Sequence, residues 1–235
     1  MTEHSGSIEL IDQIDSLDAE ADLQRGLDLL AEVKAGRRGS TLRFYRPRPT
    51  MAFGQRDANL PGFAAAAEAS RSHGFEPLVR RAGGRAMAYH QGCLVIDHLE
   101  VDAEAVLGSR RRFSEFGELF AAALRSLDVD AAVGEIPGEY CPGEFSVHGS
   151  YPARAGAELE QIKLVGTAQR VVSGAWLFSS AIVVQDASPL RAALVDVYRE
   201  LGLDWSPKTA GAAEDLQPGL TVEAVKMAVL EAYGL

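Results

Sequence analysis

Apolar residues recur at helical spacing in several parts of the chain. Between Ser16 and Lys34 the leucines and valines fall at near-helical spacing, and Ser16 and Asp18 are residue types that commonly start helices. An alanine-rich segment opened by Pro61 and closed at His73–Gly74 predicts a second helix. Similar patterns predict three more helices, over residues 113–127, 190–201 and 221–233.

Short runs rich in branched and aromatic residues lie between these segments. They predict strands over residues 41–46, 50–54, 76–81, 86–90, 93–98, 145–149, 163–172 and 175–186. Prolines and a glycine pair mark the turns between them. The least ordered segments are expected to be the first dozen residues, 149–161 and 208–218. The mixture indicates an α+β domain, and no change of composition marks a domain boundary.

Charge and cysteine content narrow the classes of function. The 23 basic and 33 acidic residues give a formal charge of −10, which argues against nucleic acid or an anionic membrane as partner, although a local basic patch is compatible with it. No run approaches the roughly 18 apolar residues of a membrane span. Two cysteines, Cys93 and Cys141, are too few for a disulfide framework. We therefore expect reduced thiols and a cytoplasmic protein.

The segment RRAGGRAMAYH, residues 80–90, is the first candidate for chemistry. Gly83–Gly84 allow main-chain N–H groups to approach a ligand, and the arginines around them can hold an anionic or carbonyl-bearing group. Taken by its spacing alone, the segment is more often a glycine hairpin with solvated arginines.

Three further side chains invite a chemical interpretation. Lys163 can polarise a carbonyl if it lies beside an acyl site, although most lysines are only solvated. Cys141 precedes a Pro-Gly turn and is the candidate for an exposed nucleophile, whereas Cys93 lies in an apolar strand and is expected in the core. His148 can assist Cys141 as a base, but an exposed loop histidine without a role is the more common case.

Three ordered motifs give a more specific picture. Read together, MAFGQRDANL (residues 51–60), RRAGGRAMAYH and KLVGTAQR (residues 163–170) resemble the motifs of the lipoate-protein ligase and octanoyltransferase family, within the biotin/lipoate protein ligase superfamily. The resemblance spans residues 42–186. It implies one α+β catalytic domain over residues 16–235, with mixed and antiparallel sheets flanked by helices, after a flexible segment at 1–15.

The resemblance also implies roles for individual residues. The glycine-rich loop is implied to lie along the acyl chain and its activated carboxyl, and Lys163 is implied to contact the acyl carbonyl or an adenylate. Cysteine-dependent octanoyltransferases carry a nucleophile upstream of this lysine, and Cys141, 163 − 141 = 22 residues before it, is the candidate. The implied acyl-binding residues are Arg80, Arg81, Gly83, Gly84, Arg85, His90, Gly166, Thr167 and Ala168.

The chain departs from the family pattern in two places. The interval from Cys141 to Lys163 is longer than in the transferases, and AWLFSSAIV stands where family members often carry a histidine and a glycine. Ser179 or Ser180 can take over a polar role there. Leu78, Met87 and Tyr89 can line a channel for the acyl chain or serve only in packing.

Three hypotheses of function follow. In the first, Cys141 takes an octanoyl or lipoyl group from a carrier thioester and passes it to a lysine of a lipoyl domain, with Lys163 polarising the acyl carbonyl and without cofactor or metal. In the second, an ATP-dependent ligase forms a lipoyl-adenylate with Mg²⁺. In the third, an inactive relative only binds acyl carriers. Acidic carriers would require a basic face, for which the candidates are Arg80, Arg81, Arg85 and Arg110 to Arg112.

Overall fold

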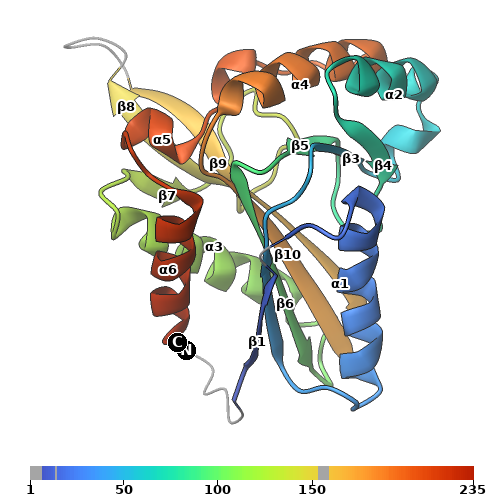
Figure 1. Cartoon of the computed structure of the whole chain (residues 1–235), viewed down its shortest axis with the longest axis vertical. Helices are drawn as coiled ribbons and strands as arrows, with labels where there is room; N and C mark the ends of the chain where they lie inside the picture. Colours follow the sequence, from blue (N-terminus) through green and yellow to red (C-terminus); the bar gives the residue numbers. More distant parts are fainter. Residues whose placement is uncertain (1–6, 14, 153–158) are drawn as a thin grey trace.

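Two β-sheets form the centre of the molecule in the computed structural model, which describes residues 7–13, 15–152 and 159–235 (Figure 1). The larger sheet has the strand order β1-β2-β6-β10-β9-β8-β7, and the smaller has the order β4-β3-β5. The β1–β2 and β3–β4 pairs are parallel, and the other pairs of named strands are antiparallel. The strands are β1 Glu9–Gln13, β2 Thr41–Tyr45, β3 Thr50–Phe53, β4 Glu76–Val79, β5 Met87–Tyr89, β6 Cys93–Val101, β7 Ala131–Val133, β8 Val147–Pro152, β9 Leu159–Val172 and β10 Ala175–Val183.

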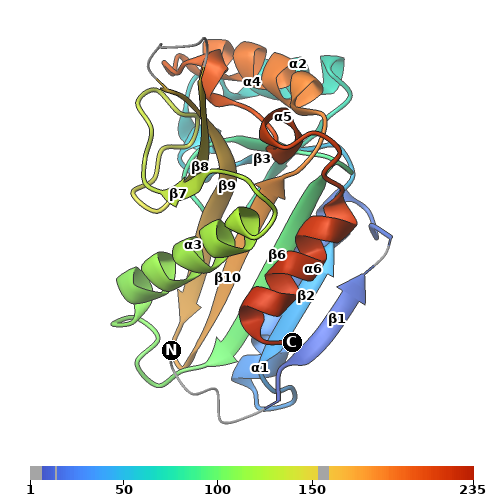
Figure 2. The same cartoon turned by 90° about the vertical axis from the view of Figure 1, so that its left-hand side faces the viewer.

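Helices cover the large sheet on both faces and the small sheet on its outer side. Helix α1 packs on one face of the large sheet, α3 and α6 lie on the other face, and α2 and α4 pack against the small sheet (Figures 1 and 2). The helical segments are α1 Ala19–Lys34, η1 Asp57–Asn59, α2 Phe63–Ser72, α3 Ser109–Arg125, α4 Ala187–Leu201, η2 Pro207–Thr209, α5 Ala213–Leu216 and α6 Val222–Tyr233. This arrangement confirms the α+β prediction.

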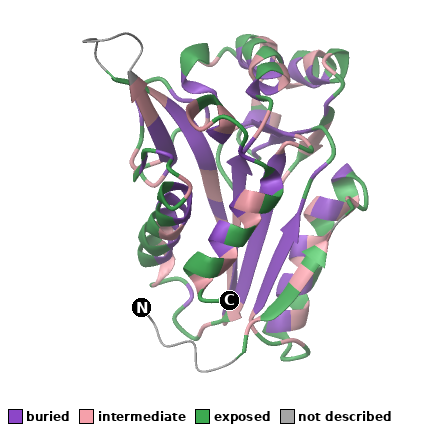
Figure 3. Ribbon diagram, turned by 60° about the vertical axis from the view of Figure 1, so that its left-hand side comes forward, coloured by how far each residue is buried: buried purple, intermediate pink, exposed green. Residues whose placement is uncertain are grey.

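The central strands are buried on both faces, as Figure 3 shows. Because successive strand residues point to opposite faces, Phe178 packs into the core under α3 and α6, while Leu177 packs under α1. A strand covered on both sides reads as a continuous apolar run, which explains the strong sequence signal of β6 and β10. Among the described residues no helix is long and apolar enough to cross a membrane.

A buried ion-pair network fixes α1 to the large sheet. Asp18 caps the helix by accepting a hydrogen bond from the Ala21 N–H at 2.7 Å. One turn further, Asp22 lies 3.0 Å from the Arg43 guanidinium, which also lies 3.0 Å from Asp97 on β6. Both carboxylates and the guanidinium are buried, so the charges satisfy one another within the protein.

Several segments expected to be irregular are regular instead. Strand β1 occupies part of the expected flexible N-terminus, because its backbone pairs with β2, a contact that its mixed apolar and acidic sequence does not signal. Residues 149–152 and 159–161 extend β8 and β9, and the 208–218 connection carries most of η2 and all of α5. The remainder of these expectations, at 1–6, 14 and 153–158, lies outside the described residues.

Candidate active site

Cys141 lies on the turn between β7 and β8 in an unusual backbone conformation. Its φ is +44°, in the left-handed region that non-glycine residues rarely adopt. Two hydrogen bonds hold it there: its N–H donates to the Tyr198 hydroxyl at 2.8 Å, and its carbonyl accepts from Lys163 Nζ at 2.6 Å. Strained conformations persist where surrounding contacts enforce them, and they are common at functional sites.

Lys163 on β9 is only 2% exposed and supports this turn. Its ammonium donates to the carbonyls of Tyr140, at 3.0 Å, and Cys141, and lies 3.4 Å from Glu139 Oε2. Glu139 Oε1 accepts hydrogen bonds from the Gly143 N–H at 2.9 Å and from the Ser146 hydroxyl at 2.8 Å. Burial raises the pKa of Glu139, and Lys163 opposes that rise. The buried pair therefore organises the whole turn from 139 to 146.

The glycine-rich loop meets the sulfur of Cys141. The Arg85 N–H donates to Cys141 Sγ at 3.3 Å, and Arg80 Nη2 lies 3.9 Å from the same sulfur. A Cβ at Gly84 would stand 3.8 Å from Sγ, and a Cβ at Gly54 would lie 1.7 Å from the Gly84 carbonyl oxygen. Glycine at position 54 thus permits the close approach of β3 to the loop. These contacts place two positively polarised donors beside the thiol.

Cys141 lines a cavity of about 710 Å³, which we call the thiol cavity. Its walls come from the glycine-rich loop, the turn at residues 139–146, which we call the cysteine turn, β9 and the start of α3. The predicted site residues among those that line it are Arg80, Gly83, Gly84, Cys141, Lys163, Gly166, Thr167 and Ala168. Residues far apart in the sequence are therefore brought to one cavity.

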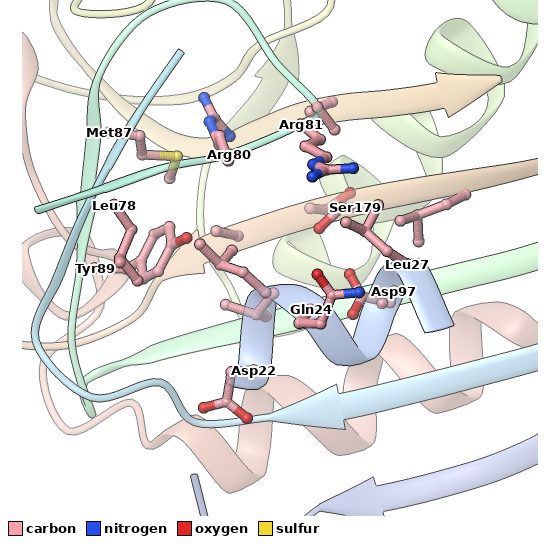
Figure 4. A pocket seen from close by; sticks show the side chains of 18 of the residues that line it. Asp22, Gln24, Leu27, Leu78, Arg80, Arg81, Met87, Tyr89, Asp97 and Ser179 are labelled. Carbon is pink, nitrogen blue, oxygen red and sulfur yellow. The ribbon is translucent and has the colours of Figure 1, made fainter. Parts of the chain in front are cut away.

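A second cavity of about 250 Å³ lies between the large sheet, α1 and the small sheet (Figure 4). We call it the inner cavity. Its residues include Leu78, Met87 and Tyr89, the three candidates for an acyl channel. Met87 packs closely on β9 at Gly166, because a Cβ at that glycine would lie only 3.0 Å from Met87 Sδ. The two cavities share Arg80, Met87, Gly166 and Ala168.

The inner cavity has a polar side. Asp97 and Ser179 are cross-strand neighbours on β6 and β10, and Asp97 accepts a hydrogen bond from Arg43 at 3.0 Å. Burial raises the pKa of Asp97, while Arg43 opposes that rise. In Figure 4 both side chains lie near Leu27 of α1, across the cavity from Leu78 and Met87. The cavity therefore combines an apolar part with a buried, hydrogen-bonded carboxyl group.

Three of the predicted residues have other positions. Arg81 lines the inner cavity rather than the thiol cavity. Arg85 reaches the sulfur through its N–H, while its guanidinium lies 3.1 Å from Asp57. His90 lines neither cavity: its Nδ1 accepts from the Gly92 N–H at 2.8 Å and its Nε2 lies 2.9 Å from the Asp186 carbonyl. In this structure the imidazole connects the turn at Gly92 with the backbone at Asp186.

The structure also shows the environments of other side chains considered in the sequence, some of which differ from expectation. His148 is buried on β8 with Nδ1 3.0 Å from the Gly134 carbonyl, so it is not an exposed loop residue, because β8 begins one residue earlier. Arg112 is buried and pairs with Asp102, so it does not belong to a basic surface. Ser180 is buried on the large sheet, and it lines the inner cavity together with Ser179, the two serines for which a polar role was predicted. Cys93 is buried in β6 as predicted, and burial raises its pKa to about 12.

Three residues of the site escaped the sequence analysis. Tyr198 on α4 bridges the Cys141 N–H and the Ala86 carbonyl, to which its hydroxyl donates at 3.0 Å. In sequence it looks like any core aromatic residue of an amphipathic helix. Glu139 stands two residues before Cys141 but carries no signal of burial. Asp57 lies inside the first family motif, MAFGQRDANL, and that motif was the signal available for it.

The thiol, the glycine-rich loop and the buried lysine all lie within one stretch of the chain that matches a known family. Residues 18–234 match the family "Lipoyl protein ligase A/B catalytic domain", and the chain belongs to that family. The predicted resemblance is thereby confirmed.

Curated relatives carry one recurring name. An octanoyl-[GcvH]:protein N-octanoyltransferase of Geobacillus kaustophilus is 29% identical over 190 residues, covering 81% of this chain and 63% of the relative. The enzyme of the same name from Exiguobacterium sibiricum is 28% identical over 205 residues, covering 79% and 68%. The chain thus spans about two thirds of the length of these relatives.

Solved structures share the fold. A T. acidophilum protein solved with bound lipoic acid superposes with a TM-score of 0.73 at 19% identity, over 97% of this chain and 85% of that one. A lipoate-protein ligase A solved with ATP gives a TM-score of 0.68 at 18% identity, over 97% and 84%. The prediction of a ligase-like fold is confirmed by these superpositions.

Proposed function

We propose that this protein transfers an octanoyl or lipoyl group to a lysine of a lipoyl carrier domain through a thioester on Cys141. The observation that carries the proposal is the geometry around the sulfur. Cys141 Sγ accepts a hydrogen bond from the Arg85 N–H at 3.3 Å, at the wall of a cavity that shares four lining residues with a second, partly apolar one. Such a site offers a nucleophile, oriented donors and room for an acyl chain.

The reaction proceeds by two acyl transfers. The Cys141 thiolate attacks the carbonyl carbon of the donor acyl group, and the bond from that carbon to the donor breaks. The donor leaves with the proton given up by Cys141, as a lysine amine from an octanoyl-lysyl carrier or as a thiol from a thioester donor. The neutral amine of the acceptor lysine then attacks the enzyme thioester. An amide forms and the Cys141 thiol is restored. Because the acyl group is already bound to the donor carrier and passes from one carrier to another, neither step consumes a nucleotide.

The polar groups around the sulfur have distinct roles in this scheme. The Arg85 N–H and the Arg80 guanidinium interact favourably with negative charge on the sulfur. Arg80 Nε is buried and has no hydrogen-bond partner among the described residues, so it can donate to an acyl carbonyl. Lys163 holds the Cys141 carbonyl and adds positive charge close to the reacting carbonyl.

The inner cavity is the natural place for the acyl chain. It lies next to the thiol cavity, and Leu78 and Met87 provide apolar walls. The relatives' name describes transfer of octanoyl from GcvH to a protein. Octanoyl-GcvH is therefore the first donor to test, and the lysine of a lipoyl domain is the first acceptor.

The test is the intact mass of the purified protein after incubation with octanoyl-GcvH in the absence of ATP. We expect a mass increase of one octanoyl group that hydroxylamine removes. The adduct should be absent in Cys141→Ala and retained in Cys93→Ala, which removes the other thiol. Absence of the adduct in the wild type would exclude the cysteine route. Free lipoate with ATP and Mg²⁺ would then decide between a ligase and an inactive carrier-binding protein.

A further inference from the structure

Two large apolar side chains stand in solvent at the edge of the thiol cavity. Val106 is 71% exposed and Leu107 is 81% exposed, the highest values among the exposed large hydrophobic residues of the described chain. Both contribute to the lining of the thiol cavity. We call them the rim pair. Contiguous exposed apolar surface can mark an interaction site.

The rim pair is held in place by the protein on either side. It belongs to the connection 102–108, between β6 and α3, whose neighbouring residue Ala105 is buried. Buried Arg112 lies 3.1 Å from Asp102 and also donates to the Ala105 carbonyl. Within the connection, the Gly108 N–H donates to the Glu104 carbonyl at 3.1 Å. The exposure of Val106 and Leu107 is therefore a property of an anchored segment.

An apolar wall continues from the rim pair into the cavity. Phe113 of α3 and Phe145 of the cysteine turn stack with their ring centroids 5.9 Å apart, and both line the thiol cavity. Arg110 covers the Phe145 ring at 5.3 Å and pairs with Glu144. The wall thus connects the anchored rim with the turn that carries Cys141.

We propose that the rim pair is the docking contact for the folded body of the acylated carrier protein. The inference rests on the proposed function. A carrier is far too large to enter a cavity of about 710 Å³, so only its acyl-bearing arm can reach Cys141 while its body stays on the rim. The partner is a small folded domain with apolar side chains beside its acylated arm. Burial of Val106 and Leu107 against these side chains stabilises the complex.

A comparison of two donors tests the docking contact. The double variant Val106→Ser/Leu107→Ser should raise KM for octanoyl-GcvH roughly tenfold or more with little change in kcat, because exposed anchors contribute binding energy. With octanoyl-N-acetylcysteamine, a small thioester without a protein body, the double variant should lower kcat/KM twofold or less. Met227→Ser on α6 removes another exposed apolar side chain, at 55% exposure and away from the cavity, and should change neither value.

A binding measurement separates this inference from the chemistry. Calorimetric titration of octanoyl-GcvH into Cys141→Ala protein should give a Kd that the rim variant raises roughly tenfold. If the wild type forms no acyl-enzyme but this difference is found, the proposed function fails and the docking contact stands. The docking contact is wrong if the variant leaves KM and Kd for GcvH unchanged. It is also wrong if the variant slows acyl transfer from both donors equally, or if the variant instead dissociates a dimer of this chain.

Discussion

The two cysteines of the chain occupy opposite kinds of environment. Cys93 lies in the regular strand β6, is fully buried, and has a pKa that burial raises to about 12. Cys141 lies on a turn with φ +44°, is partly exposed, and opens into the thiol cavity. The cysteine side chain thus serves in core packing at position 93 and is a candidate nucleophile at position 141. The difference comes from the surroundings of the two thiols.

The comparison also shows what it takes to present a reactive thiol. Cys93 needs only the regular pairing of β6 with β10. Cys141 depends on hydrogen bonds with three separate parts of the fold: it donates to Tyr198 on α4 and accepts from Lys163 on β9 and from the Arg85 N–H of the glycine-rich loop. A nucleophile held in a strained conformation requires such support, because the strain would otherwise relax.

The largest expected difference is in reactivity toward a small alkylating reagent. At pH 8 a thiol with a pKa of about 12 is a thiolate in only about one molecule in ten thousand, and burial restricts access further. We expect iodoacetamide to modify Cys141 in the folded protein at least about a thousandfold faster than Cys93. Peptide mass spectrometry over a time course measures both rates, and unfolding in urea should equalise them. Comparable rates in the folded protein would contradict the assignment of Cys141 as the accessible thiol.

The fold could be predicted from the sequence to a large extent. Strands β6 and β10 are long apolar runs, and α1 has both a capping residue and a periodic apolar face. These signals are local and were read correctly. Strand β1 was missed because its order comes from pairing with β2, about thirty residues away, and its own sequence is mixed.

The candidate site could be predicted only in part. Motifs identified the glycine-rich loop, Lys163 and Cys141, which the fold brings to one cavity. The supporting contacts were not predictable, because nothing near Tyr198 in the sequence indicates that its hydroxyl reaches the Cys141 N–H. His90 shows the converse: it matches a motif, yet in this structure it contacts Gly92 and Asp186 outside both cavities.

The second prediction concerns the buried pair behind Cys141. Lys163→Met removes the donor to the Tyr140 and Cys141 carbonyls and leaves Glu139 buried without its cation. Loss of one partner of a buried pair destabilises by about 3–5 kcal/mol. Acyl-enzyme formation should fall at least about a hundredfold, since the turn and the nearby positive charge are both lost. Urea unfolding and the rate of octanoyl adduct formation measure the two effects.

A double variant separates stability from chemistry at this position. Lys163→Met with Glu139→Gln removes both charges, while the amide oxygen can still accept from the Gly143 N–H and the Ser146 hydroxyl. We expect it to regain much of the lost stability without regaining the rate. If the rate recovers together with stability, Lys163 has only a structural role.

The smallest predicted effect is that of the Tyr198 hydroxyl, and it tests whether a single contact positions the nucleophile. Burial raises the pKa of Tyr198, so the hydroxyl stays protonated, donates to the Ala86 carbonyl and accepts from the Cys141 N–H. Tyr198→Phe should cost about 1–2 kcal/mol of stability, because the buried Ala86 carbonyl and the partly buried Cys141 N–H lose their partner. It should also lower kcat for acyl-enzyme formation roughly tenfold, with little change in KM, since the turn is free to relax.

The matched control is Tyr151→Phe, which removes a hydroxyl that donates to Glu160 at 3.0 Å on the surface and should leave kcat unchanged. Alkylation of Cys141 by iodoacetamide adds a readout that a merely stabilising role would not move. In Tyr198→Phe that rate should change even at temperatures where the protein is fully folded, because the position of the sulfur relative to the Arg85 N–H is altered. A folded Tyr198→Phe variant with wild-type kcat and wild-type alkylation would show that Lys163 and the glycine-rich loop suffice to hold Cys141. The contrast between the two cysteines would then rest on those two elements alone.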